Sequence, residues 1–144
     1  MSHARELLDA GPGPGSLDPN ELSAAIDACL DAAQACTSCA DADLAEEDVA
    51  EMRTCIGLCS DCADVCGATA RVLSRQIRYD ELLVTRLLQA CVRACASCAE
   101  ECARHADHHA HCRICEEVCR ECEAACRRLL DSEAFQELQA LAGG

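Results

Sequence analysis

From residue 19 to about residue 130, small apolar residues recur every three or four positions, and Asp, Glu and Arg fill many of the positions between them. This spacing is typical of amphipathic α-helices, because residues three and four apart lie on one face of a helix. Ala, Leu, Glu, Arg and Gln, which favour helices, dominate the chain, and β-branched residues are too scattered to predict a strand. The pattern predicts an all-α protein.

Polar capping residues mark where the first two long helices begin. Asp18 stands before Pro19, a combination that predicts a helix start, and this helix should run to about Ala40. Asp43, followed three residues later by a glutamate, resembles a capping box and predicts the start of a second helix. We expect that helix to run to about Arg75.

The second half of the chain contains one ambiguous stretch. Asp80 predicts another helix start, but no glycine or proline follows before Arg128, so a single helix of roughly fifty residues, about 75 Å long, is formally possible. We expect instead a turn near Asp107, because a fourth helix over 109–130 would then match the others in length. The result is an antiparallel four-helix bundle with short loops.

The bundle is expected to occupy 19–130, with a different kind of segment on each side. All three prolines lie within the first nineteen residues, so 1–18 should form a tail or short helix with a Gly/Pro link. Phe135 and Leu138 suggest a short C-terminal helix and tail within 131–144.

Cysteine occupies one face of every predicted long helix. In CVRACASCAEEC, residues 91–102, the cysteines have gaps of 4, 3 and 4, and residues 55–66 repeat these gaps. At about 100° per residue, each set falls within a band of about 60°. In a bundle such faces meet at the axis, so one interior should hold Cys29, Cys36, Cys39, Cys55, Cys59, Cys62, Cys66, Cys91, Cys95, Cys98, Cys102, Cys112, Cys115, Cys119, Cys122 and Cys126.

Composition narrows the function classes. Sixteen cysteines in 144 residues leave a disulfide scaffold, a metal protein or a redox protein as candidates. A net charge of -14 without a single lysine argues against nucleic acid and an anionic membrane surface. The N-terminus lacks the features of a secretory signal, so we expect a cytoplasmic protein whose thiols stay reduced. We also expect no membrane-spanning segment, since no apolar run approaches about 18 residues.

The pattern favours Cu(I) among the metals that thiolates bind. Zinc prefers four ligands in a tetrahedron, usually on paired loops, whereas Cu(I), a soft ion, is content with two or three thiolates. If each ion takes two thiolates and each thiolate bridges two ions, capacity is about one ion per cysteine. Such a number indicates storage rather than catalysis, so we expect no enzyme activity.

The two ends of the predicted bundle differ in chemistry. His105 and His109 continue the cysteine stripe beyond Cys102, and either copper ligation or a favourable helix end explains them. His108 and His111 are interpreted as helix-end residues only. We expect the opposite end to be an apolar plug that excludes water, made of Leu22, Ile26, Leu73, Ile77, Leu83, Leu87, Leu129 and Leu130.

The cysteine pattern resembles a known family. CxxxCxxCxxxC at 55–66 and 91–102, CxxCxxxCxxCxxxC at 112–126 and the two histidines above are similar to the cytosolic branch of the bacterial copper storage proteins, over about residues 20–130. The resemblance implies a homotetramer of four-helix bundles that each hold many Cu(I) ions along the axis. It also implies a copper chaperone as a possible partner.

The main hypothesis is therefore cytosolic storage of many Cu(I) ions by cysteine thiolates, which protects the cell from copper. Two alternatives remain open from the sequence. A thiol redox protein should have one or two exposed cysteines of low pKa near positive charge. A zinc or cadmium thiolate buffer would use the same cysteines for a divalent ion.

Overall fold

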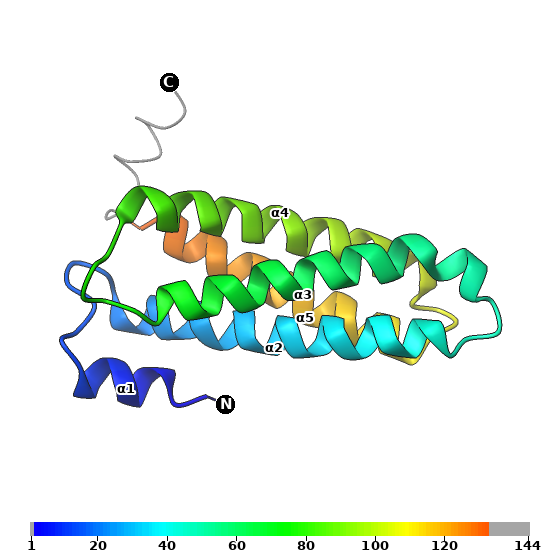
Figure 1. The fold of residues 1–144 in the computed structure, drawn as a ribbon, viewed down its shortest axis with the longest axis horizontal. Helices are drawn as coiled ribbons and strands as arrows, with labels where there is room; N and C mark the ends of the chain where they lie inside the picture. The colour runs from blue at the N-terminus through cyan, green and yellow to red at the C-terminus, as the bar shows by residue number, and fades with distance from the viewer. Residues whose placement is uncertain (1, 133–144) are drawn as a thin grey trace, which may run out of the picture.

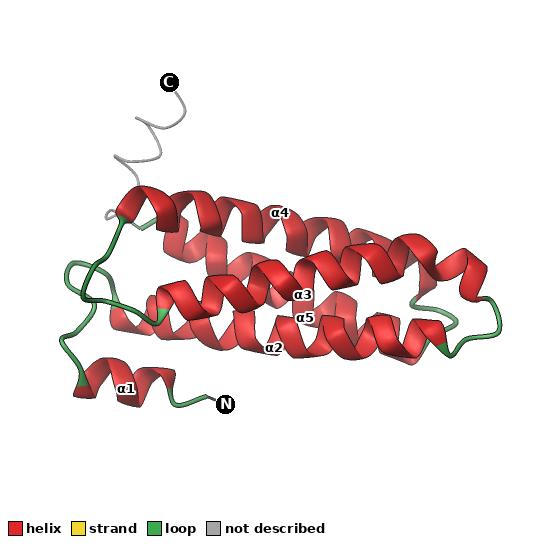
Figure 2. Ribbon diagram, in the orientation of Figure 1, coloured by secondary structure: helices red, strands yellow, loops and turns green. Residues whose placement is uncertain are grey.

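The computed structural model describes residues 2–132, and every regular element in that range is helical (Figure 2). The elements are α1 (Ala4–Ala10), α2 (Pro19–Leu44), the short 3₁₀ helix η1 (Val49–Met52), α3 (Arg53–Leu73), α4 (Glu81–His105) and α5 (Ala110–Leu130). The all-α prediction is confirmed.

The four long helices lie side by side and alternate in direction (Figure 1). α2 packs against α3 and α5, and α4 packs against the same two neighbours. Each long helix therefore has two flanking helices and turns one side toward the bundle axis. This is the antiparallel four-helix bundle that the sequence predicts.

Two of the predicted helix caps form as expected. The side chain of Asp18 accepts a hydrogen bond from the backbone N–H of Asn20 at 2.7 Å, at the start of α2. The side chain of Asp80 accepts one from the N–H of Leu83 at 3.0 Å, at the start of α4. The predicted turn near Asp107 is also present, because α4 ends and α5 begins on either side of it.

The prediction that Asp43 caps the second long helix is wrong. Asp43 lies in the last turn of α2, which continues to Leu44, and its side chain is fully buried. It follows Cys39 by four residues and Cys36 by seven, so helical periodicity places it on the buried face of α2. The next α-helix begins only at Arg53, after η1.

The N-terminal segment folds back onto the bundle. α1 packs against α2, and Leu8 and Leu17 are buried there (Figure 1). Between the two helices, Gly13 and Gly15 have φ values of +86° and +62°, which side chains with a Cβ rarely allow. The short helix predicted within 131–144 lies outside the described residues.

The leucine end lies at the start of α2 and the end of α5, and only some of the residues predicted to form its apolar plug are buried. Leu22, Ile26, Leu73, Leu129 and Leu130 are buried as expected.

Ile77 and Leu83, assigned to the same plug, are instead 85% and 53% exposed. Ile77 lies in the loop before α4, and Leu83 is off the face of α4 that carries Cys91. Val84 and Leu88, seven and three residues before Cys91, are on that face and fill the space.

α4 is long and apolar enough to cross a membrane by length and composition alone, contrary to our expectation from the sequence. Cysteine, alanine and leucine raise its hydropathy. In the structure the cysteine face of α4 belongs to the core of the bundle, where it is buried between α3 and α5.

Candidate metal centre

All sixteen cysteines are free thiols in the bundle interior, and none is more than 2% exposed. α2 contributes three of them, α3 four, α4 four and α5 five. The cysteine faces predicted from the spacing therefore converge on one interior. Because buried cysteine packs as a small hydrophobe, the same side chains form the core and the candidate metal centre.

Neighbouring sulfurs form a network along the bundle axis, which we call the sulfur column. Its contacting Sγ atoms are 3.4–4.0 Å apart. Cys36 on α2, for example, lies 3.4 Å from Cys119 on α5 and 3.8 Å from Cys98 on α4. Contacts of this kind connect all four long helices, so the thiols form one centre rather than separate sites.

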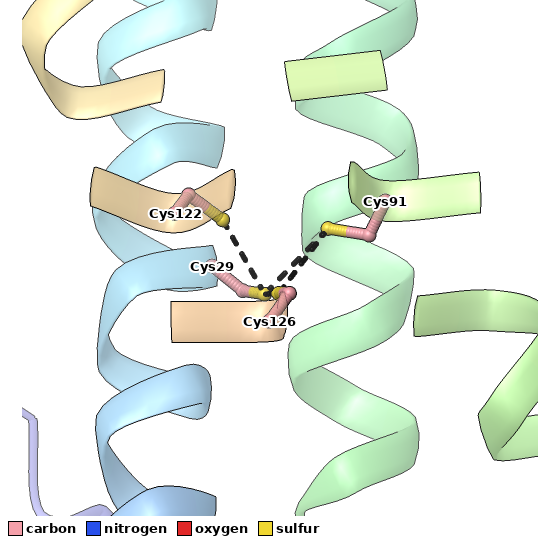
Figure 3. Close-up of side chains that lie close together, drawn as sticks. All are labelled: Cys29, Cys91, Cys122 and Cys126. Carbon is pink, nitrogen blue, oxygen red and sulfur yellow. Dashed lines mark hydrogen bonds between the residues drawn. The ribbon is translucent and has the colours of Figure 1, made fainter. Parts of the chain in front are cut away.

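The sulfur column reaches the leucine end. There Cys29, Cys91, Cys122 and Cys126 point toward one another from α2, α4 and α5 (Figure 3). Cys29 Sγ lies 3.7 Å from the sulfurs of both Cys122 and Cys126, and 3.8 Å from that of Cys91.

Several cysteines belong to more than one cluster of four sulfurs. Cys91 and Cys122 take part in a cluster with Cys29 and Cys126 and in another with Cys66 and Cys95. Cys115 is likewise shared between two clusters nearer the other end. Donor atoms within each cluster lie within 4.8 Å of one another. Shared sulfurs can bridge metal ions, so neighbouring sites can form a continuous polynuclear array.

The buried thiols can ionise together only in the presence of a counter-charge. Burial raises the pKa of the Cys112 thiol, and the neighbouring groups of Cys55 and Asp43 raise it further. Sixteen buried thiolates without counter-charge would be strongly unfavourable, whereas a bound cation displaces the thiol proton. The burial of every cysteine also argues against the redox alternative, which needs an exposed thiol.

The end of the bundle where α2 stops and α5 starts carries the histidines and is called the histidine end. His105 Nε2 lies 2.9 Å from a carboxylate oxygen of Glu101. His109 lies 3.3 Å from Asp48 and 3.4 Å from Glu46, also through carboxylate oxygens. The structure thus brings both histidines to the expected end, where they contact acidic side chains, and their role as copper ligands stays a prediction.

His111, interpreted from the sequence as a helix-end residue only, contacts the sulfur column directly. Its Nδ1 lies 3.4 Å from Cys39 Sγ and 3.5 Å from Cys112 Sγ. Its Nε2 lies 3.0 Å from a carboxylate oxygen of Glu46. A carboxylate only accepts, so Nε2 carries a proton in this contact, and Nδ1 faces the two sulfurs. The ring also stacks on that of His109, with centroids 5.4 Å apart.

Asp43 is the second functional candidate that the sequence interpretation missed. Its Oδ1 lies 3.6 Å from Cys112 Sγ, and its Oδ2 has no hydrogen-bond partner among the described residues. Burial raises the pKa of this carboxyl from 3.8 to about 7. The signal was available, because spacings of three and four continue the stripe of Cys36 and Cys39 to position 43.

Comparison with known proteins agrees with this geometry. The family model described as "Copper storage protein" matches residues 18–131. A comparison with curated protein sequences gives no significant match.

Solved structures of the copper storage protein Ccsp from Streptomyces lividans are similar to this chain. The structure loaded with 10 copper equivalents has 51% sequence identity and a TM-score of 0.86, and the match covers 88% of this chain and 97% of that one. A five-copper structure of this cytosolic protein has 53% identity and a TM-score of 0.77, with 78% and 94% covered. A variant with one histidine replaced by alanine has 52% identity and a TM-score of 0.79, with 81% and 97% covered.

The buried carboxyl of Asp43 predicts a pH-dependent effect on stability. A raised pKa in the folded state stabilises the protein below the unfolded value of 3.8, and this contribution is lost as pH rises through about 7. The substitution Asp43→Asn removes the ionisable group. As the pH rises from 5 to 8, the unsubstituted protein should therefore lose on the order of 2 kcal/mol in free energy of unfolding that the variant does not lose.

Urea denaturation of the reduced, metal-free proteins at the two pH values measures this difference. Asp41→Asn, an exposed change on the same helix, is the matched control and should show no such dependence. An identical pH dependence for the Asp43 variant and the parent would contradict the assignment of a buried carboxyl with a raised pKa.

Proposed function

This chain belongs to the copper storage protein family, and we propose on that basis that it stores many copper ions as Cu(I) along its sulfur column. The observation that carries the proposal is the unbroken set of buried thiols from Cys29 and Cys126 at one end to Cys39 and Cys112 at the other. Storage in the cytoplasm keeps copper away from other thiol and iron–sulfur proteins.

The oxidation state follows from the donor set. Thiolate is a soft ligand that favours Cu(I), and a dry interior of reduced thiols keeps the metal in that state. Sulfurs such as Cys91, Cys115 and Cys122, which belong to two clusters each, are placed to bridge ions. Bridging of this kind gives a capacity of about one ion per cysteine, or around sixteen.

Storage fits the site better than catalysis does. A catalytic metal keeps an open position for substrate, whereas here each four-sulfur cluster is enclosed by other sulfurs and by the helices. The similarity to the cytosolic protein of Streptomyces lividans supports a cytoplasmic location.

Copper should enter at the histidine end. The leucine end is closed by fully buried side chains, including Leu22, Leu73 and Leu129. At the histidine end, His105 and His109 are solvent-accessible enough to receive an ion and to transfer it to the column, with 17% and 13% of each side chain exposed. Carboxylates beside them make this end attractive to cations.

We further propose that four copies of the bundle associate, as the family resemblance implies. Large apolar side chains remain exposed on the outer faces of the long helices, among them Leu30, Leu82 and Ile114 at 41–50%. Burying these faces between copies would remove apolar surface from water. A copper chaperone that delivers ions to the histidine end is the expected partner.

The storage proposal predicts a large copper capacity. The fully reduced protein, titrated anaerobically with Cu(I) against a colorimetric Cu(I) chelator, should take up about one ion per cysteine. The double substitution Cys62→Ser and Cys95→Ser, whose sulfurs are 3.8 Å apart, should lower the capacity by about two ions. Ser60→Ala, on the exposed side of α3, is the control and should leave it unchanged. Saturation at one to four ions, or failure to compete with the chelator, would contradict storage.

The tetramer proposal is tested by light scattering on the full-length, reduced protein after size exclusion. With a chain mass of 15.3 kDa, the expected mass is about four times that value. A mass equal to one chain across the micromolar range would rule the tetramer out.

A further inference from the structure

The donor atoms change in kind where the sulfur column meets the histidine end. Cys39 and Asp43 from the last two turns of α2 face His111 and Cys112 from the first turn of α5. This group contains two sulfurs, one nitrogen and one carboxylate oxygen, whereas the clusters deeper in the column contain sulfur alone. A mixed set of this kind is typical of binding sites for borderline divalent ions such as zinc.

The four donor atoms are already close to a tetrahedron. Cys39 Sγ and Cys112 Sγ are 4.0 Å apart, and His111 Nδ1 lies 3.4 and 3.5 Å from them. Asp43 Oδ1 is 3.6 Å from both Cys112 Sγ and His111 Nδ1. For zinc bound at ordinary ligand distances, the edges of the tetrahedron would be about 3.4 to 3.8 Å. All four atoms lie within 4.8 Å of one another, so only small shifts would be needed to bind an ion.

The carboxylate has a buried oxygen that the protein itself leaves unsatisfied. Asp43 is fully buried, and its Oδ2 has no hydrogen-bond partner among residues 2–132. Buried polar atoms without a partner are uncommon and costly, whereas a bound cation would satisfy this group.

Glu46 orients the imidazole of His111, as residues that hydrogen-bond to metal ligands do in other proteins. The Nε2–H of His111 donates to Glu46 at 3.0 Å, which directs Nδ1 toward the two sulfurs. The side chain of His111 is 25% exposed, so the group is open to solvent on one side.

Charge favours a divalent ion at this group more than at the deeper clusters. Two thiolates and one carboxylate carry three negative charges, which a divalent ion reduces to one and a monovalent ion only to two. A four-thiolate cluster with a divalent ion would keep two negative charges in a drier part of the interior, after the loss of four thiol protons. We propose that Cys39, Asp43, His111 and Cys112 form a tetrahedral binding site for one divalent ion of the zinc type.

Such an ion would affect copper uptake, a consequence that rests on the proposed storage function. It would occupy the end of the column where copper enters and take Cys39 and Cys112 out of the thiol set. Zinc bound there would slow Cu(I) uptake by the protein, and it would also take the Cys39 sulfur from the next cluster inward.

The test is to add one equivalent of Zn²⁺ to the reduced, metal-free, full-length protein and to record its zinc X-ray absorption spectrum. We expect two sulfur and two nitrogen or oxygen neighbours. A zinc ion surrounded by four sulfurs would overturn the proposal. This readout needs no variant, and it is independent of the Cu(I) titration, so failure of the zinc site and failure of copper storage are distinguishable.

Affinities of variants give a second test, by competition with a chromophoric zinc chelator. Asp43→Asn and His111→Ala should each weaken binding of the first zinc ion by at least about tenfold. Asp41→Asn, an exposed change on α2 two residues before Asp43, is the matched control and should leave that affinity unchanged. Circular dichroism shows whether each variant is folded. Folded Asp43 and His111 variants with parental zinc affinity would also overturn the proposal.

Discussion

The central constraint on this molecule is that its hydrophobic core and its candidate metal centre are the same side chains. A four-helix bundle must bury one face of each helix, and here those faces carry sixteen cysteines. Cysteine is small and packs as a hydrophobe, so the helices bury it without cost while the thiols stay neutral. The same sulfurs are able to act as ligands once a cation displaces their protons. Replacing them with leucine would give an ordinary core and remove the metal centre.

The choice of small residues explains the rest of the composition. Bulky aromatic side chains would separate sulfurs that have to lie 3.4–4.0 Å apart, and Tyr79 and Phe135 are the only Phe, Tyr or Trp residues in the chain. Each Cu(I) ion replaces about one proton, so loading would leave the acidic net charge nearly unchanged. The leucine end is closed by buried side chains and the histidine end is polar, so the two ends of the column differ, and we propose that copper is exchanged at the histidine end.

Helical periodicity predicts the cysteine faces and the bundle correctly, because the cysteines within each helix are three, four or, between Cys29 and Cys36, seven residues apart. It failed where two local signals competed. Asp43 has the form of a helix cap, but its position on the stripe of Cys39 places it inside α2. His111 sits beside Cys112 in sequence, yet its contact with Cys39 depends on how α2 and α5 approach each other, which no local pattern contains. Leu83 and Ile77 are at the predicted end of the bundle, but Leu83 is off the buried face of α4 and Ile77 lies in the loop before it, so both are exposed.

Crystals of the copper-loaded protein, measured on both sides of the copper absorption edge, test copper storage along the sulfur column most directly. Anomalous difference density should show many copper ions in a row inside the bundle, from the level of Cys29 and Cys126 to that of Cys39 and Cys112, with sulfur atoms as their main ligands. Copper confined to one or two positions, or bound mainly on the outer surface, would contradict storage along the sulfur column.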